Sequence, residues 1–219
     1  MNDTASTLAS QAYTQLRTEL LAGAIEPGSK IRIRQICAHI GVGLSPMREA
    51  LNRLVNEGLV IQSDRRGFTA APLDLDDLAD LTLARSELNA AALRDAIAYG
   101  GTRWEEQAVL AHHRMAQAGV GSPEWDGLHR AFHAALLSAC RSQRLLQYCA
   151  QLFDAADRYR LMARASGGGR DTASEHAAIL QALVERDASL AVALLRAHVE
   201  ATALLVRRAM VTRLPAGQR

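Results

Sequence analysis

The sequence predicts a mainly α-helical protein: an N-terminal winged helix-turn-helix with a small β wing, then a C-terminal antiparallel bundle of about six helices. Two observations carry this prediction. Between residues 27 and 69, two short helical patterns flank a turn and precede a basic hairpin, which is the layout of a winged helix-turn-helix. From residue 74 onward, long helical patterns alternate with short connections, which is typical of a helical bundle.

The N-terminal segment opens with apolar residues at helical spacing over residues 8–21, which predicts one helix. A short helix is predicted over residues 34–39. It should end at Gly41, because glycine accepts the left-handed backbone of a helix C-terminus. The next helix is predicted to begin at Ser45-Pro46, where a hydroxyl can cap free amides and proline suits the first helical position.

This second helix leaves Arg48, Asn52 and Arg53 on outer faces, from which they can reach DNA phosphates or base edges. Residues 59–61 can form a strand, and a basic turn at residues 64–67 leads into the returning strand. The alternative is a helical hairpin with a solvated charged face. The ordered sequence of turn, helix start, basic helix and basic wing favours the winged motif.

Length and charge distribution suggest two domains. A chain of 219 residues, 49% hydrophobic, can bury a sizeable core. The boundary is predicted at Ala71-Pro72, giving a DNA-binding domain over residues 7–71 and a helical domain over residues 74–212. Residues 28–66 hold seven basic against three acidic residues, whereas residues 71–219 hold 17 of each. A local excess of this size suits a phosphate backbone but binds weakly alone, so two copies are expected.

The chain has no run of about 18 apolar residues and no basic-then-apolar leader, so a cytoplasmic protein without membrane association is expected. Its three cysteines, Cys37, Cys140 and Cys149, lack CxxC spacing and are expected to be reduced, packed thiols.

Six helices are predicted in the C-terminal segment, over residues 75–99, 102–118, 122–140, 142–165, 172–186 and 188–210. The fifth is predicted to open with a capping box at residues 172–175, a role that would account for Glu175. Asp187 is predicted to cap the sixth.

Histidines of the predicted bundle suggest a metal site. His129 and His133 are four residues apart, so their rings share one helix face and can converge on one ion. His176 and His198 lie on two further helices, and facing helices of a bundle can close such a site. The alternative, common for a histidine pair at this spacing, is a surface or packing role without metal.

The sequence resembles the GntR family of bacterial transcription regulators. The resemblance rests on the stretch PGSKIRIRQICAHIGVGLSPMREALNRLVNEGLV and the RRGF that follows it. The helical remainder resembles the FCD ligand-binding domain of the FadR-type branch, so the resemblance covers about residues 8–212. The GVGLSP variant resembles a subgroup that senses small carboxylates, including a glutarate-responsive regulator.

The resemblance implies a divalent metal held by His129, His133, His176 and His198, since the pairs Phe132-His133 and Glu175-His176 match the family pattern. His129 departs from it, because this position is usually Asp. A site of four neutral imidazoles would leave the +2 charge of the ion uncompensated, which favours an anionic ligand, and zinc or nickel over manganese. Two alternatives stay open: His129 turns away and water takes its place, or Asp126 contributes.

The resemblance also implies DNA and effector contacts. Leu44 replaces a base-contacting arginine of the family, which suggests an unusual operator. The predicted DNA-contacting residues are Arg34, Ser45, Pro46, Arg48, Arg53, Arg65, Arg66 and Gly67. The predicted effector-binding residues are Arg85, which matches a carboxylate-pairing position, Asn89, which stands where the family usually has Glu, and Arg130. Arg158 and Arg160 are further candidates, although a surface position is the more usual one for each.

The sequence therefore predicts a homodimeric repressor that reads a two-fold-symmetric DNA operator and responds to a small carboxylate bound near zinc or nickel. One alternative is a regulator of the same fold without metal that senses an acyl or other apolar ligand. Another is a metalloenzyme, but four protein ligands would leave no open position for substrate. The chain is accordingly expected not to be an enzyme.

Overall fold

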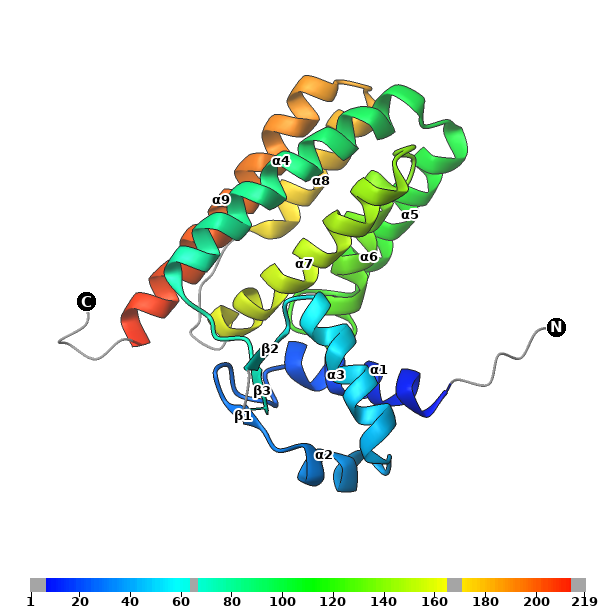
Figure 1. Ribbon diagram of the computed structural model, residues 1–219. Helices are drawn as coiled ribbons and strands as arrows, with labels where there is room; N and C mark the ends of the chain where they lie inside the picture. The colour runs from blue at the N-terminus through cyan, green and yellow to red at the C-terminus, as the bar shows by residue number, and fades with distance from the viewer. Residues whose placement is uncertain (1–6, 64–66, 165–170, 214–219) are drawn as a thin grey trace.

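The computed structural model describes residues 7–63, 67–164 and 171–213. Helices dominate it (Figure 1), which confirms the predicted fold class. Its elements, in chain order, are α1 (Leu8–Leu21), β1 (Lys30–Ile31), α2 (Ile33–Ile40), α3 (Leu44–Asn56), β2 (Val60–Ser63), β3 (Gly67–Ala70), α4 (Leu75–Tyr99), α5 (Thr102–Ala118), α6 (Trp125–Leu137), α7 (Gln143–Arg164), α8 (Thr172–Val184) and α9 (Ala188–Arg213).

The N-terminal segment packs α1, α2 and α3 on a three-stranded antiparallel sheet of order β1-β3-β2. Thr69 of the central strand pairs with Lys30 on one side and with Ile61 on the other. The sequence predicted only the β2–β3 hairpin, because a two-residue strand is too short to show alternation. Leu16 of α1 and Met47 of α3 are fully buried in one core with the sheet, and partly buried apolar residues of α2 pack against it.

The turn between α2 and α3 agrees with the sequence at one end and differs at the other. Gly41 ends α2 with φ at +78°, as predicted. Helix α3 begins at Leu44 with Gly43 as its N-cap and no side-chain cap bond, so the prediction that Ser45 caps it is wrong. Pro46 occupies the third helical position, where its missing N–H removes one of the amides that a cap would serve.

Helices α4 to α9 form the bundle (Figure 1), six helices among the described residues, as predicted. The long helices α4 and α9 lie side by side, with α7 packed against both, and α5 packs on α6 and α8. Two apolar clusters divide the interior. Along α4, Leu78 and Leu81 belong to one cluster and Ala90 and Leu93 to the other. The buried polar residues lie between these clusters, so the bundle encloses a polar layer.

The sequence predicted the N-terminal cap of α9 correctly but not that of α8. Asp187 caps α9 through a 2.9 Å bond from the Leu190 amide, as predicted. The capping box predicted for α8 is absent, because Asp171 is its N-cap and accepts a 3.0 Å bond from Ser174. The Glu175 side chain is therefore engaged elsewhere. Helix α6 is also shorter than predicted, since the chain from Gly119 to Glu124 forms turns and the helix ends at Leu137.

By length and composition, residues 188–212 of α9 could cross a membrane, contrary to the expectation that the chain has no such segment. In the structure this helix packs against α4, α7 and α8 and contributes to both apolar clusters of the bundle. Such a helix is equally typical of the core of a helical bundle.

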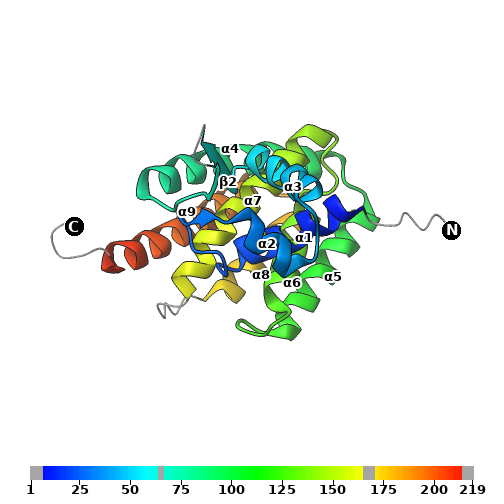
Figure 2. The same ribbon diagram turned by 60° about the horizontal axis from the view of Figure 1, so that its bottom comes forward.

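The N-terminal segment lies against one end of the bundle, where α1 contacts α7 (Figures 1 and 2). Arg158 of α7 donates a 2.6 Å hydrogen bond to the Ala71 carbonyl at this junction and is only 7% exposed. The expectation that Arg158 is a surface residue is therefore wrong. Its guanidinium anchors the segment that connects the wing to α4.

Candidate metal centre and adjoining cavities

Four buried histidines meet in the polar layer of the bundle. His129 and His133 come from α6, His176 from α8 and His198 from α9. One nitrogen of each ring lies within 4.8 Å of those of the other three. The Nε2 atoms of His129 and His133 are 3.1 Å apart, and two nitrogens bound to one tetrahedral zinc are about 3.3 Å apart. The one-turn spacing on α6 thus brings two donors to the separation that one ion requires.

Glu175 orients one of these rings. Its Oε2 lies 2.8 Å from Nδ1 of His198, which leaves Nε2 of that ring for the centre of the cluster. A carboxylate on the second nitrogen is the usual partner of a metal-binding imidazole, because it fixes the tautomer and raises the basicity of the ligand. It also places one negative charge beside the four neutral rings, so the histidine site is less cationic than the sequence suggested.

The donor set fits a divalent metal of borderline softness. His129 Nδ1 is buried without a hydrogen-bond partner among the described residues, so the protein alone does not satisfy this ring. Burial, followed by the charge of Arg160, lowers the pKa of His129 well below 6.5; burial likewise lowers the pKa of His133. Both rings are therefore held in the neutral form that binds metals. Four imidazoles suit zinc, nickel or copper rather than manganese.

The structure distinguishes the alternatives for position 129. The His129 ring stacks on Trp125 with centroids 4.5 Å apart and faces the other three histidines, so it does not turn away. Asp126 lies outside the cluster and accepts a 2.8 Å bond from Arg160.

Two cavities border the histidine cluster, one on each side of Phe153. The larger, of about 340 Å³, is mostly apolar and touches His133; the smaller, of about 110 Å³, touches His129 and His198. The predicted effector residues divide between them: Asn89 and Arg130 line the larger cavity, and Arg85 lines the smaller. The single effector cavity expected from the sequence is thus two cavities that share one aromatic wall.

Arg85 is a buried cation without an anionic partner among the described residues. It is 6% exposed, and no hydrogen bond or ion pair joins it to another described residue. Its guanidinium lies 4.9 Å from the centre of the Phe153 ring. Burial lowers the pKa of Arg85 to about 10, which leaves it charged at neutral pH. A buried charge of this kind is costly unless an anion pairs with it.

The other arginines near the cavities already have carboxylate partners. Arg160 donates to Asp157 at 2.6 Å and to Asp126 at 2.8 Å. Arg130 is ion-paired with Asp154 of α7. Of these three arginines, Arg85 would therefore gain the most from binding an anionic ligand.

The predicted DNA-contacting residues lie on the N-terminal segment. Arg34, Ser45 and Arg48 are exposed, Pro46 is half-buried, and Gly67 is exposed with φ at +83°. Arg53 is exposed, but its guanidinium lies 3.8 Å from the centre of the Tyr13 ring. Arg65 and Arg66 lie outside the described residues.

Sequence reasoning missed three residues of the site. The position of Glu175 next to His176 could have indicated a role in the site, but the sequence analysis assigned its side chain to a capping box. Phe153 and Asp154 carried none, since an aromatic and an acidic residue are ordinary members of an amphipathic helix.

Comparison with known proteins adds two family matches. Residues 8–69 match the model described as bacterial regulatory proteins, gntR family, and residues 80–201 match the FCD domain. The second match alone covers more than half of the chain.

Individual proteins match over most of their length. The chain is 32% identical over 205 residues to the uncharacterized HTH-type transcriptional regulator BphR of Paraburkholderia xenovorans LB400, covering 90% of this chain and 84% of BphR. It is 30% identical over 209 residues to the HTH-type transcriptional repressor GlaR of Escherichia coli K12, covering 90% and 95%. Among solved structures, E. coli McbR/YncC matches with a TM-score of 0.79 at 18% identity, covering 92% and 98%. The last match shows the fold alone.

Proposed function

Since this chain belongs to the GntR family of bacterial transcription regulators, we propose that it is a repressor whose affinity for DNA is controlled by a small carboxylate bound near a divalent metal ion. The observation that carries the proposal is the four-histidine cluster beside Arg85, which has no anionic partner in the part of the chain that the structure describes. The similarity to the repressor GlaR supports repression as the direction of control.

The metal would be held by His129, His133, His176 and His198, with zinc favoured over nickel by its preference for four-coordinate imidazole sites. When bound, it supplies positive charge that attracts an anionic ligand. Arg85 offers a planar guanidinium that can bind a carboxylate through two parallel hydrogen bonds. The walls at Phe153 and Trp125 exclude water from this pair, which strengthens it.

The DNA-binding role is assigned to residues 7–71 and the effector role to residues 74–212. In a homodimer, two copies of α3 would enter successive major grooves of a two-fold-symmetric operator, with Arg48 exposed on α3 and Arg34 exposed on the neighbouring α2. A carboxylate that binds one spacing of the two DNA-binding segments better than another would change operator affinity by shifting that equilibrium. Such a repressor acts in the cytoplasm, with DNA as its partner and no enzymatic step.

One observation favours a second candidate. The larger cavity is lined mainly by apolar groups, among them Leu137, Leu146 and Leu195. A cavity of this kind suits an acyl or other apolar ligand that needs no metal. In that case the histidines would be structural and Arg130 would meet the polar end of the ligand.

Metal analysis and thermal unfolding together decide between the candidates. Protein purified without chelator is analysed for metal, then unfolded with linear mono- and dicarboxylates, with and without prior chelation. The proposal predicts one metal per chain and an acid that stabilises only the metal-bound protein, by about 2.7 kcal/mol at 100 times its Kd. The matched control is His113→Ala, an exposed histidine of α5, which should change neither result.

Absence of stoichiometric metal would refute the metal site. Stabilisation by long-chain acids that persists after chelation would instead support the apolar ligand. Metal without any carboxylate effect would refute control by a carboxylate.

A further inference from the structure

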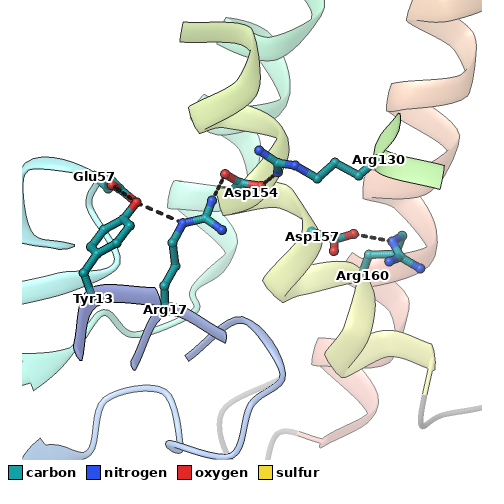
Figure 3. Close-up of polar contacts among 7 residues, drawn as sticks. All are labelled: Tyr13, Arg17, Glu57, Arg130, Asp154, Asp157 and Arg160. Atoms are coloured by element: carbon teal, nitrogen blue, oxygen red, sulfur yellow. Dashed lines mark hydrogen bonds and ion pairs between the residues drawn. The ribbon is translucent and has the colours of Figure 1, made fainter. Parts of the chain in front are cut away.

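We propose that Asp154 couples the effector cavity to the DNA-binding segment by binding Arg130 and Arg17 at the same time. This inference rests on the proposed function, because it assigns a route by which occupancy of that site reaches α3. Figure 3 shows the two guanidinium groups approaching the carboxylate from opposite sides.

On the bundle side, the connection begins at the cavity wall. Arg130 lines the larger cavity and follows His129 directly on α6. Its guanidinium pairs with Oδ1 of Asp154. Phe153, the residue before Asp154, forms the wall shared by the two cavities. A ligand in either cavity therefore touches a direct neighbour of Asp154 or its cation partner.

On the DNA-binding side, the connection runs from α1 to the end of α3. Arg17 of α1 donates to Oδ2 of Asp154 through Nη2 and to Glu57 through Nε, at 3.2 Å. Glu57 is the C-cap of α3 and also accepts a 2.5 Å bond from the Tyr13 hydroxyl. The carboxylate of Asp154 is thus two side chains away from the helix predicted to read DNA.

The charges along this route alternate, which makes the two contacts of Asp154 interdependent. Arg130 and Arg17 are cations, Asp154 and Glu57 are anions, and Asp154 is only 6% exposed. Because water competes little for a buried carboxylate, each guanidinium weakens the attraction of Asp154 for the other. Arg130 lines the larger cavity, so an anion bound there can draw its guanidinium away from Asp154. Asp154 is then paired with Arg17 alone. The pair that joins α7 to α1 should then strengthen and hold the DNA-binding segment more firmly against the bundle.

A double-mutant cycle tests this coupling without a known effector or operator. Arg130→Gln imitates withdrawal of Arg130, and Arg17→Gln breaks the contact on the DNA-binding side. The readout is amide hydrogen exchange of α1 in the full-length protein. We expect Arg130→Gln to slow exchange and Arg17→Gln to speed it, each by about threefold or more, the size of coupling usual for residues in one network. In the Arg17→Gln background, Arg130→Gln should have no effect on α1.

The matched control is Asp95→Asn. This carboxylate of α4 pairs at 2.8 Å with Arg141, which lies in the connection between α6 and α7, and no hydrogen bond or ion pair among the described residues joins it to α1. In the Asp95→Asn variant, the rate of amide hydrogen exchange in α1 should equal that of the wild type. Asp154→Asn should speed amide exchange in α1, as Arg17→Gln does. If Asp154→Asn does not fold, the double-mutant cycle still tests the coupling, because its variants keep Asp154.

The proposal is overturned if Arg130→Gln leaves exchange in α1 unchanged, or if its effect persists after Arg17 has been replaced. If the carboxylate and metal experiment fails, the proposed effector is refuted, but the result of the double-mutant cycle is unaffected because the cycle uses no ligand. A flat cycle in a protein that does bind a carboxylate would refute Asp154 as the connection and leave the effector site intact.

Discussion

Glu175 and His198 are joined by a 2.8 Å contact between Oε2 and Nδ1, across the interface of α8 and α9. Glu175 precedes His176, so two neighbouring residues serve the cluster in different ways: one ring enters it, and one carboxylate orients a ring of another helix. A carboxylate on the second ring nitrogen is the usual partner of a metal-binding imidazole, so this pair supports the proposed metal site.

Replacing Glu175 by Gln should weaken metal binding by about 10- to 100-fold, the usual cost of losing a partner of a ligating histidine. Competition with a chromophoric chelator measures the change. Glu185→Gln, which removes an exposed carboxylate bonded to Gln181 at the other end of α8, is the control and should bind metal normally. Equal affinity in the two variants would mean that Glu175 does not support the site.

His129→Asp should retain one metal per chain but shift its preference from zinc and nickel towards manganese. The carboxylate adds negative charge and a harder donor where the imidazole now lies. Affinities for the three ions, measured by calorimetry on the metal-free protein, give the ratio. His112→Asp, a half-buried position on α5, controls for the added charge. An unchanged ratio would indicate that position 129 is not a ligand.

Arg85→Met should remove the stabilisation by carboxylates and raise the stability of the ligand-free protein. The guanidinium is buried without an anion from any described residue, and replacing buried ionic groups by apolar residues often stabilises a protein by about 1–4 kcal/mol. For a chain of this size, each kcal/mol raises Tm by roughly 2–4 °C. Arg94→Met, an exposed position on the same helix, should change neither quantity. A lower Tm for Arg85→Met would contradict the inference that the buried charge of Arg85 destabilises the ligand-free protein.

Arg48→Ala should weaken operator binding by about 1–3 kcal/mol per DNA-binding segment without unfolding the protein. Its side chain is exposed on α3, whereas Met47 beside it is fully buried and maintains the core. Band-shift titration against operator DNA, with circular dichroism to verify folding, measures the loss. Arg103→Ala, exposed on α5, should bind DNA normally. Normal binding by Arg48→Ala would refute its assignment to DNA.

Gly100→Ala should destabilise the bundle by about 1–3 kcal/mol, the usual cost of overpacking. A Cβ at this position would lie 2.0 Å from the Trp104 ring and 2.6 Å from the Ala96 carbonyl oxygen. Gly101→Ala is a matched control, because a Cβ there meets nothing within 4 Å. Denaturant unfolding of both variants gives the difference, and equal midpoints would contradict the close packing at this turn.

The sequence by itself determined the helices and the residue types of the site. Apolar spacing located α4 and α5 at their observed ends, and Gly41 ended α2 as predicted, because these signals are local. It misplaced the start of α3 and the cap of α8, where neighbouring residues compete for the same amides. The histidine set followed from spacing and family resemblance, since a one-turn interval fixes the face of a helix before any packing is known.

Only the tertiary structure decided how these residues are partnered. Glu175 binds His198, and Asp154 contacts both Arg130 and Arg17. Arg160 is held by two carboxylates, whereas Arg85 has none among the described residues. Apart from the Arg160–Asp157 pair within α7, each of these contacts joins two different helices. Periodicity shows which face of a helix is buried, but the partner of a buried charge depends on which helices pack together and at what height.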